Sequence, residues 1–139
     1  MPGENQKTSQ PIRRFCDLIG LKFIKMEKGF SRSELKITDS HLNPYDSLHG
    51  GVIYTMADTG MGGALSTCLE EDERCSTIEI KINYLKSMHS GRLVCDTKVI
   101  HKGKSVAFLE SVVKDHETQL VATATGTFNI FKNKKRGVP

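Results

Sequence analysis

The chain has 139 residues, of which 37% are hydrophobic and 12 are glycine. This length fits one domain with one hydrophobic core, and the composition excludes a collagen-like or disordered polymer. The net charge of +4 comes from the last eight residues, which carry four basic side chains and no acidic one. Because the rest of the chain has no net charge, we expect no nucleic acid and no membrane as partner.

The cysteines and the N-terminal residues bear on the compartment of the protein. The four cysteines include no Cys-x-x-Cys pair, which disfavours a zinc ribbon or a redox pair; they are Cys16, Cys68, Cys75 and Cys95. The first residues are polar and lack the apolar stretch of a signal peptide. These features predict a cytoplasmic protein with free thiols.

The first third of the chain predicts short elements. Residues 1–9 are expected to be disordered, and the apolar spacing over 11–19 predicts a helix that Gly20 ends. Residues 30–38 alternate in an irregular, strand-like way, and residues 39–47 form a turn-rich loop.

The segment 49–69 is expected to form the main helix. Its single charge is Asp58, and this central carboxylate would cost roughly 2.5–3.5 kcal/mol in a membrane, so the segment indicates a buried helix of a soluble protein. Gly60, Gly62 and Gly63 each cost about 1 kcal/mol relative to alanine inside a helix. We therefore expect a sheet that approaches this helix closely.

After a charged corner at residues 70–74 the hydrophobic period becomes two. The pattern places Ile78, Ile80, Ile82 and Tyr84 on one face of a strand. Three more strands are predicted, at 92–101, 105–114 and 120–130. Their short breaks, at 90–91, 102–104 and 115–117, predict antiparallel neighbours. The fold class is therefore α+β, with one long helix packed on an antiparallel sheet.

Two features of the main helix could carry chemistry. Glycines at its start, Gly50 and Gly51, leave backbone N–H groups open to an anion or a polarised carbonyl, although a glycine needed only for the turn is the alternative. Asp58 is a carboxylate in an uncharged helix, which requires a use or a partner. The alternatives for Asp58 are partial exposure to solvent or a hydrogen bond to a nearby serine or threonine.

The spacing of these features predicts a dimer. Gly50 and Asp58 are eight residues apart, which is about 12 Å along a helix, whereas one reacting carbonyl needs both groups within about 3 Å. Two antiparallel copies of the helix could bring Gly50 of one chain near Asp58 of the other. If the site exists, we expect an obligate dimer.

The order of the motifs resembles a known family. Asn43, His49-Gly50-Gly51, Asp58 and the alternating strand 77–85 are similar to the hot-dog-fold acyl-CoA thioesterases of the phenylacetate-degradation type, which are related to the 4-hydroxybenzoyl-CoA thioesterases. The similarity extends over residues 12 to 131. It implies a hot-dog fold, in which a single antiparallel sheet wraps one long central helix, paired into homodimers and further into dimers of dimers. The implied domain covers residues 10–131, followed by a basic tail at 132–139.

The resemblance also implies roles for single residues. The N–H of Gly50 would donate to the thioester carbonyl, and Asp58 would act as nucleophile or as general base toward water. Asn43 would orient the thioester or the attacking water, Thr77 would help to place that water, and His49 would organise the loop.

Substrate binding is assigned in the same way. Gly51 and Tyr84 would contact the substrate, and the segment that would hold the CoA nucleotide consists of His101, Lys102, Gly103, Lys104, Ser105 and Val106. Backbone N–H and ammonium groups of such a turn can face phosphates, although a solvated hairpin is the alternative. CoA belongs to the substrate, so we expect no separate cofactor and no metal.

Three functions fit these residues. The first is hydrolysis of an aryl- or fatty acyl-CoA to the free acid and CoA. The second is a non-catalytic acyl-CoA binder or sensor on the same fold. The third is a hot-dog dehydratase or hydratase, which needs a different arrangement of histidine and carboxylate. The spacing favours the thioesterase.

Overall fold

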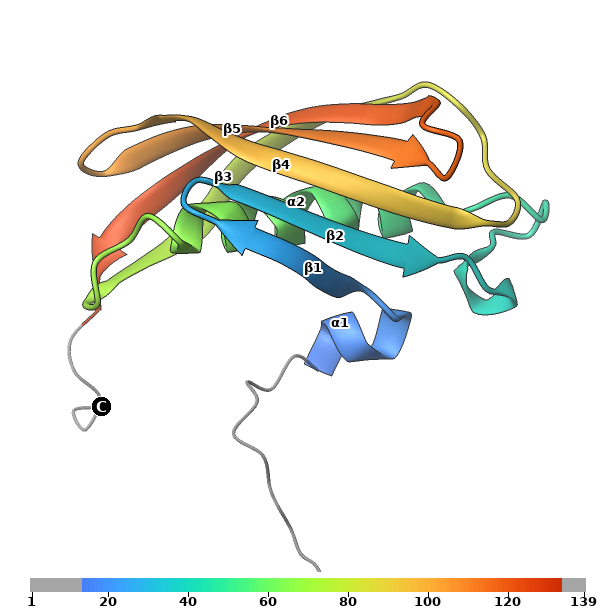
Figure 1. Cartoon of the computed structure of the whole chain (residues 1–139), viewed down its shortest axis with the longest axis horizontal. Coiled ribbons are helices and arrows are strands. Elements are labelled where there is room, and N and C mark those ends of the chain that lie inside the picture. Colours follow the sequence, from blue (N-terminus) through green and yellow to red (C-terminus); the bar gives the residue numbers. More distant parts are fainter. Residues whose placement is uncertain (1–13, 134–139) are drawn as a thin grey trace, which may run out of the picture.

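The computed structural model describes residues 14–133. Two α-helices, one short 3-10 helix and six strands make up this part of the chain (Figure 1). In order they are α1 (Arg14–Ile19), β1 (Lys22–Glu27), β2 (Phe30–Lys36), the 3-10 helix (Asp39–His41), α2 (Gly50–Ser66), β3 (Glu73–Tyr84), β4 (Arg92–Lys102), β5 (Val106–Asp115) and β6 (Leu120–Lys132).

The six strands form one antiparallel sheet in the order β1-β2-β4-β5-β6-β3. Helix α2 lies along one face of this sheet and contacts all six strands (Figure 1). The predicted α+β architecture, with one long helix packed on a single antiparallel sheet, is confirmed. The described part of the helix predicted at 11–19 is α1.

Two strands differ from the sequence prediction. Strand β1 was not predicted, because its pairing shifts register between Phe23 and Lys25 and this irregularity breaks the alternation of its side chains. Strand β3 begins at Glu73, inside the segment expected to be a charged corner, and its first residues pair with the end of β6.

The prediction that the break at 90–91 joins neighbouring strands is wrong. β5 and β6 lie between β4 and β3, so the connection 85–91 must cross three strand spacings, or about 14 Å. An extended chain of that length can reach about 23 Å, which makes the crossing possible. The predicted pairs β4–β5 and β5–β6 are confirmed.

The core lies between α2 and the inner face of the sheet. Alternation along β2, β4 and β5 sends every second side chain to this face. Fully buried apolar side chains there are Leu35, Leu93, Leu109 and Val113 from the sheet and Met56, Met61 and Leu65 from α2.

The close approach of sheet and helix explains two of the three helix glycines. A Cβ at Gly60 would lie 2.7 Å from Thr97 Oγ1, and one at Gly63 would lie 2.7 Å from the ring of Phe23. At Gly62 a Cβ would meet nothing within 4 Å. The packing argument therefore holds for Gly60 and Gly63 and is wrong for Gly62.

The ends of the chain lie largely outside the described residues. This applies to the predictions for residues 1–9 and for all of the basic tail except Lys132 and Asn133. Lys132 Nζ lies 3.2 Å from Asp72 Oδ1. No helix within 14–133 is long and apolar enough to cross a membrane. All four cysteines carry free thiols.

Candidate functional site

Helix α2 begins with an open backbone donor. His49 is the N-cap of α2, and its Nδ1 accepts the N–H of Gly51 at 2.8 Å. Its carbonyl accepts the N–H of Val52 at 3.0 Å. Within residues 14–133 no partner accepts the N–H of Gly50, the first residue of the helix. A donor with the partial positive charge of a helix N-terminus is therefore available at Gly50.

The side chain of Tyr84 packs against Gly50. Its hydroxyl donates to the carbonyl of Gly50 at 3.0 Å, and a Cβ at Gly50 would lie 3.1 Å from the Cζ of this ring. Only glycine leaves room for the tyrosine ring without a shift. Partial burial raises the pKa of the Tyr84 phenol, with a smaller contribution from Tyr54, so the hydroxyl keeps its proton for this bond.

Asn43 organises the loop before α2. Its Oδ1 accepts the N–H groups of Tyr45 and Ser47, at 2.8 and 3.1 Å, and its own N–H donates to the carbonyl of Ser47. The side-chain oxygen is thus used by the loop, and within the described chain the amide Nδ2 has no hydrogen-bond partner. Asn43 can therefore offer a donor, but not an acceptor, to a substrate.

The structure brings Asp58 and Thr77 together. Thr77 Oγ1, on β3, donates to Asp58 Oδ1, on α2, at 2.7 Å. Asp58 is half-buried and has no cationic partner among residues 14–133. The hydroxyl alternative considered for Asp58 thus exists, and it leaves the second carboxylate oxygen, Oδ2, open.

A β-bulge aims Thr77 at the helix. The register of β3 against β6 shifts between Thr77 and Glu79, so Ile78 is an extra residue in the strand. Because of the bulge, Thr77 and Ile80 both face α2 although they are three residues apart. Ile78 is 57% exposed, so its expected place on the buried face is wrong.

Cys75 is a neighbour of Asp58 that the sequence analysis did not single out. It lies on β3, two residues before Thr77, and is half-buried. Burial raises the pKa of the Cys75 thiol, and the negative charge of Asp58 raises it further. The sequence shows only that Cys75 lies on the same strand as Thr77, which does not reveal that the charge of Asp58 acts on its thiol.

Gly50 and Asp58 remain apart within one chain. Helix α2 is continuous from Gly50 to Ser66, so the two residues are separated by about 12 Å along its axis. The structure does not bring Asn43, His49 or Gly51 to Asp58 either, because they belong to the start of the helix or to the loop before it.

The predicted nucleotide-binding segment lies at the other end of the sheet. It forms the hairpin between β4 and β5, where the N–H of Gly103 donates to the carbonyl of Val106 at 2.8 Å. Ser105 accepts from the N–H of Ile130, which pairs with Cys75 at the start of β3, whereas Tyr84 ends β3 beside Gly50. Lys102 and Lys104 are exposed, and within 14–133 neither forms an ion pair.

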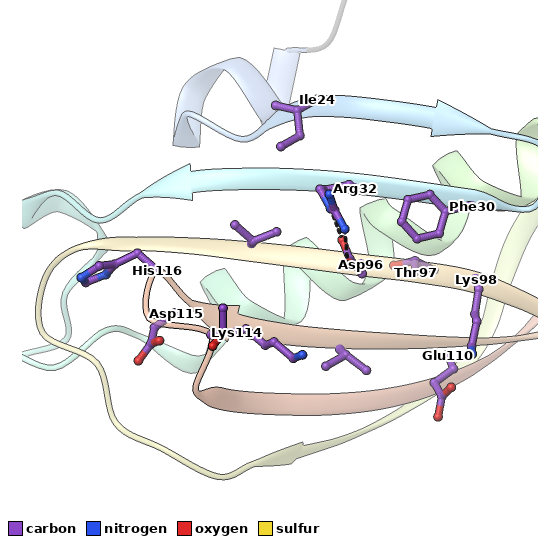
Figure 2. Close-up of a pocket in the computed structure, with 13 residues that line it drawn as sticks. Ile24, Phe30, Arg32, Asp96, Thr97, Lys98, Glu110, Lys114, Asp115 and His116 are labelled. Carbon is purple, nitrogen blue, oxygen red and sulfur yellow. Dashed lines mark hydrogen bonds and ion pairs between the residues drawn. The ribbon is translucent and has the colours of Figure 1, made fainter.

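A cavity lies on the outer face of the sheet. It has a volume of about 630 Å³, and Figure 2 shows that Arg32 and Asp96 face each other within it. These two form an ion pair with distances of 2.6 and 2.9 Å, so their charges cancel. None of the predicted site residues lines this cavity. A smaller cavity of about 300 Å³ lies beside Gly50 and Tyr84, where the open donor is.

Among the residues that the structure describes, no group of three or more histidine, cysteine, aspartate or glutamate side chains could hold a metal ion.

Comparison with known families identifies the chain. Residues 45–122 match the family described as the Thioesterase superfamily. The chain belongs to this superfamily. The match spans the start of α2, Asp58, Thr77 and the β4–β5 hairpin, and it places the chain among thioester hydrolases.

Relatives within the thioesterase superfamily cover most of the chain. The 1,4-dihydroxy-2-naphthoyl-CoA hydrolase of Listeria monocytogenes is 29% identical over 86% of this chain and 97% of its own length. The acyl-coenzyme A thioesterase PaaI of Escherichia coli is 26% identical over 78% of this chain and 76% of its own length. The resemblance to the hot-dog thioesterases of the phenylacetate-degradation type is confirmed.

Solved structures confirm the hot-dog fold. A conserved protein of Pseudomonas aeruginosa superposes with a TM-score of 0.82 at 29% identity and covers 86% of this chain and 95% of its own. The PaaI protein of the Escherichia coli phenylacetic acid degradation operon gives a TM-score of 0.80 at 21% identity, with 86% of each chain covered.

Proposed function

We propose that the protein hydrolyses acyl-CoA thioesters at a site shared by two subunits. The observation that carries this proposal is the Asp58–Thr77 pair, a mid-helix carboxylate held by a hydroxyl, with no cation to neutralise it among the described residues. Two further facts support the proposal: the open N–H of Gly50 and the membership of the chain in the thioesterase superfamily.

In the proposed reaction the thioester carbonyl accepts a hydrogen bond from the N–H of Gly50, which stabilises the developing oxyanion. Oδ2 of Asp58 of the partner subunit removes a proton from water as the water oxygen bonds to the carbonyl carbon. Alternatively, the carboxylate attacks first and forms an anhydride that water then cleaves. In both routes the carbon–sulfur bond breaks, and the CoA sulfur leaves and takes a proton.

The remaining residues of the start of α2 would support this step. His49 caps the helix and keeps the loop in place, while Nδ2 of Asn43 can donate to the thioester or to the attacking water. Gly51 and Tyr84 border the small cavity at Gly50 and would contact the substrate there. The reaction needs no metal and no separate cofactor, because CoA arrives with the substrate.

The distance between Gly50 and Asp58 supports the proposed homodimer. Strand β3 lies at the edge of the sheet and is free to pair with β3 of a second copy. Such pairing about a two-fold axis would set two α2 helices antiparallel and bring Gly50 of one chain toward Asp58 of the other. A further association of two dimers remains a prediction.

The same arrangement suits the CoA nucleotide. The hairpin at His101–Val106 lies far from Gly50 in its own chain, but an antiparallel partner would bring it toward the partner's Gly50. The exposed ammonium groups of Lys102 and Lys104 can then meet the phosphates.

The acyl group is proposed to be apolar, either aryl or fatty. A cavity of about 400 Å³ lies against Thr59 and Gly63 of α2 and is bordered by Phe15, Phe23 and Met26. These side chains offer apolar and aromatic surface next to the turn that carries Asp58.

The test is thiol release from a panel of aryl- and fatty acyl-CoAs, with Asp58→Ala and Asp58→Asn as variants. We expect activity in the natural protein and a loss of about 100-fold or more in both variants, with CoA binding and the dimer retained. Absence of turnover with CoA binding retained would favour a non-catalytic acyl-CoA binder. Equal activity in all three proteins would contradict the role of Asp58.

A further inference from the structure

Three hydroxyl side chains form a row inside the core. Ser31 on β2, Thr97 on β4 and Ser111 on β5 are directly paired cross-strand neighbours, and all three are 0% exposed. We refer to them as the hydroxyl row. Burial of a hydroxyl is unfavourable unless it is hydrogen-bonded, so the position of three of them beneath a helix requires an explanation.

The hydroxyl row bonds to the backbone of α2. Ser31 Oγ donates to the carbonyl of Gly60 at 2.8 Å, and Ser111 Oγ donates to the carbonyl of Ala57 at 3.4 Å. Thr97 Oγ1 and Ser111 Oγ are 2.6 Å apart and share a further hydrogen bond. A helix carbonyl has a second lone pair, so these bonds add to the bonds within α2.

A thiol adds a weaker bond of the same kind. Cys95 lies on β4 two residues before Thr97. Its Sγ lies 3.7 Å from the carbonyl oxygen of Met56. Burial raises the pKa of the Cys95 thiol to about 11, so it stays protonated and can donate.

Ser31, Ser111 and Cys95 bond to the turn of α2 that carries Asp58. Thr97 forms no hydrogen bond to α2 itself and acts on this turn through its bond to Ser111. Ala57 and Gly60 lie one residue before and two residues after Asp58. Gly60 is rotated by about 200° from Asp58 around the helix axis, so the hydroxyl row contacts this turn from the side opposite the carboxylate. Thr77, on β3 of the same sheet, bonds to the carboxylate itself.

We propose that the hydroxyl row positions Asp58 against Thr77. Ser31, Thr97 and Ser111 are positioning residues: they touch no substrate and act through the helix. Apolar packing alone would let the helix slide or turn slightly over the sheet, whereas directional hydrogen bonds fix its height and its rotation. The inference rests on the proposed function, in which the orientation of Asp58 governs the rate.

The chain contains a matched control. Ser33 lies on β2 two residues from Ser31 and is also 0% exposed, but its Oγ has no hydrogen-bond partner among residues 14–133. Ser31→Ala and Ser33→Ala remove the same atom from the same strand at the same burial. Only Ser31→Ala breaks a bond to α2.

Thr97 provides a second comparison. A packing role and a hydrogen-bonding role predict opposite orders of kcat for the variants Thr97→Val and Thr97→Ser. Thr97→Val keeps the volume and loses the hydroxyl, whereas Thr97→Ser keeps the hydroxyl and loses a methyl group. If Thr97 only fills space, Thr97→Ser is the more damaging change. If the hydroxyl positions Asp58, Thr97→Val has the lower kcat.

The experiment measures kcat and KM for the acyl-CoA that the natural protein turns over best. We expect Ser31→Ala and Thr97→Val to lower kcat by about 10- to 100-fold with KM changed less than about two-fold. Thr97→Ser and Ser33→Ala should keep the natural kcat. An equal loss in Ser31→Ala and Ser33→Ala, no loss in Ser31→Ala, or a larger loss in Thr97→Ser than in Thr97→Val would overturn the proposal.

A second readout does not depend on activity. Crystal structures of Ser31→Ala and Thr97→Val should show α2 displaced over the sheet and the bond from Thr77 to Asp58 broken. An unmoved helix with this bond intact in both variants would overturn the proposal. A natural protein that hydrolyses no thioester would refute the proposed function, and the crystal structures would still decide whether the hydroxyl row positions Asp58.

Discussion

Thr77 Oγ1 donates to Asp58 Oδ1 over 2.7 Å and thereby joins the edge strand β3 to the middle of α2. The bond occupies one carboxylate oxygen and fixes the direction of the other. It depends on the β-bulge at Ile78, since without the extra residue Thr77 and Ile80 could not both face the helix.

Thr77→Val should lower kcat by about 10-fold, because the isosteric side chain cannot hold the carboxylate. KM should stay nearly constant, since Thr77 is expected to act on Asp58 and on the attacking water rather than on CoA. Steady-state thioester hydrolysis measures both quantities. Thr77→Ser, which keeps the hydroxyl, is the control and should retain most of the activity; a loss as large as that of the valine variant would exclude the hydrogen bond as the cause.

Two inactive variants should restore activity when they form mixed dimers. Gly50→Pro removes the N–H donor at the first position of a helix, where the backbone tolerates proline, and His49 before it is already extended. The added Cβ requires the Tyr84 ring, 3.1 Å away, to shift by a few tenths of an ångström. A mixed dimer of Gly50→Pro and Asp58→Asn holds one intact site only if Gly50 and Asp58 act across the interface. Random mixing should give about a quarter of the natural activity, because half of the dimers are mixed and each has one site.

Thiol release after co-refolding of the two variants measures this recovery. Each variant refolded by itself is the control. Activity of the mixture no higher than that of the separate variants would show that the site does not combine Gly50 and Asp58 from different chains.

Alanine at two nearby helix glycines should change stability in opposite directions. Gly60→Ala should destabilise the fold by about 1–3 kcal/mol, since its Cβ would lie 2.7 Å from Thr97 Oγ1. Gly62→Ala meets nothing within 4 Å and should stabilise the fold by up to about 1 kcal/mol through helix propensity. Urea unfolding of the two variants and the natural protein measures both changes, and a shift of the same sign in both would contradict the packing argument.

Asp115 should stabilise the fold in a way that depends on pH. Its side chain is 4% exposed, and the hydrogen bond from Lys86 at 2.6 Å, followed by those from the N–H groups of Gln119 and Glu117, lowers its pKa to about 2. Because the pKa is lower in the folded state, this stabilisation is complete above about pH 4 and is lost as the pH falls toward 2.

Asp115→Asn should therefore have a lower midpoint of thermal unfolding than the natural protein at pH 5–7, and the difference should shrink between about pH 4 and pH 2. Asp17→Asn, at an exposed position of α1, is the control and should show a much smaller difference. A difference that stays constant down to pH 2 would show that the charge of Asp115 is not its source.

Much of the fold could be predicted from the periodicity of the sequence. The alternation in β4, β5 and β6 reflects one buried and one exposed face, and the glycine-rich start of α2 marks its boundary. In β2 the buried face carries Ser31 and Ser33 while Phe30 lies outward, so hydrophobicity gave no guide to its orientation. Pairing of β3 with β6 is a contact between distant segments, and a short connection could not reveal it.

The residues of the candidate site that lie on α2 could be predicted from the sequence, whereas their contacts with the sheet could not. Gly50 was recognisable as a glycine at a helix start and Asp58 as the one charge in that helix, and the distance between them follows from helix geometry. The hydrogen bonds of Thr77 to Asp58 and of Tyr84 to Gly50 depend on how β3 lies over α2, and this depends on the bulge at Ile78. The partners of the hydroxyl row required the full sheet order.

The place of β3 beside β6 determines when the site can form during synthesis. Within the described chain, the sheet neighbour of β3 is β6, which begins at Leu120, so Thr77 acquires its strand partner more than forty residues after it has left the ribosome. Until β6 has been synthesised, α2 can pack only against the strands that precede β6 in the chain. The bond from Thr77 to Asp58 should therefore be among the last native contacts to form, and a nascent chain that ends before β6 should fold in part without gaining activity.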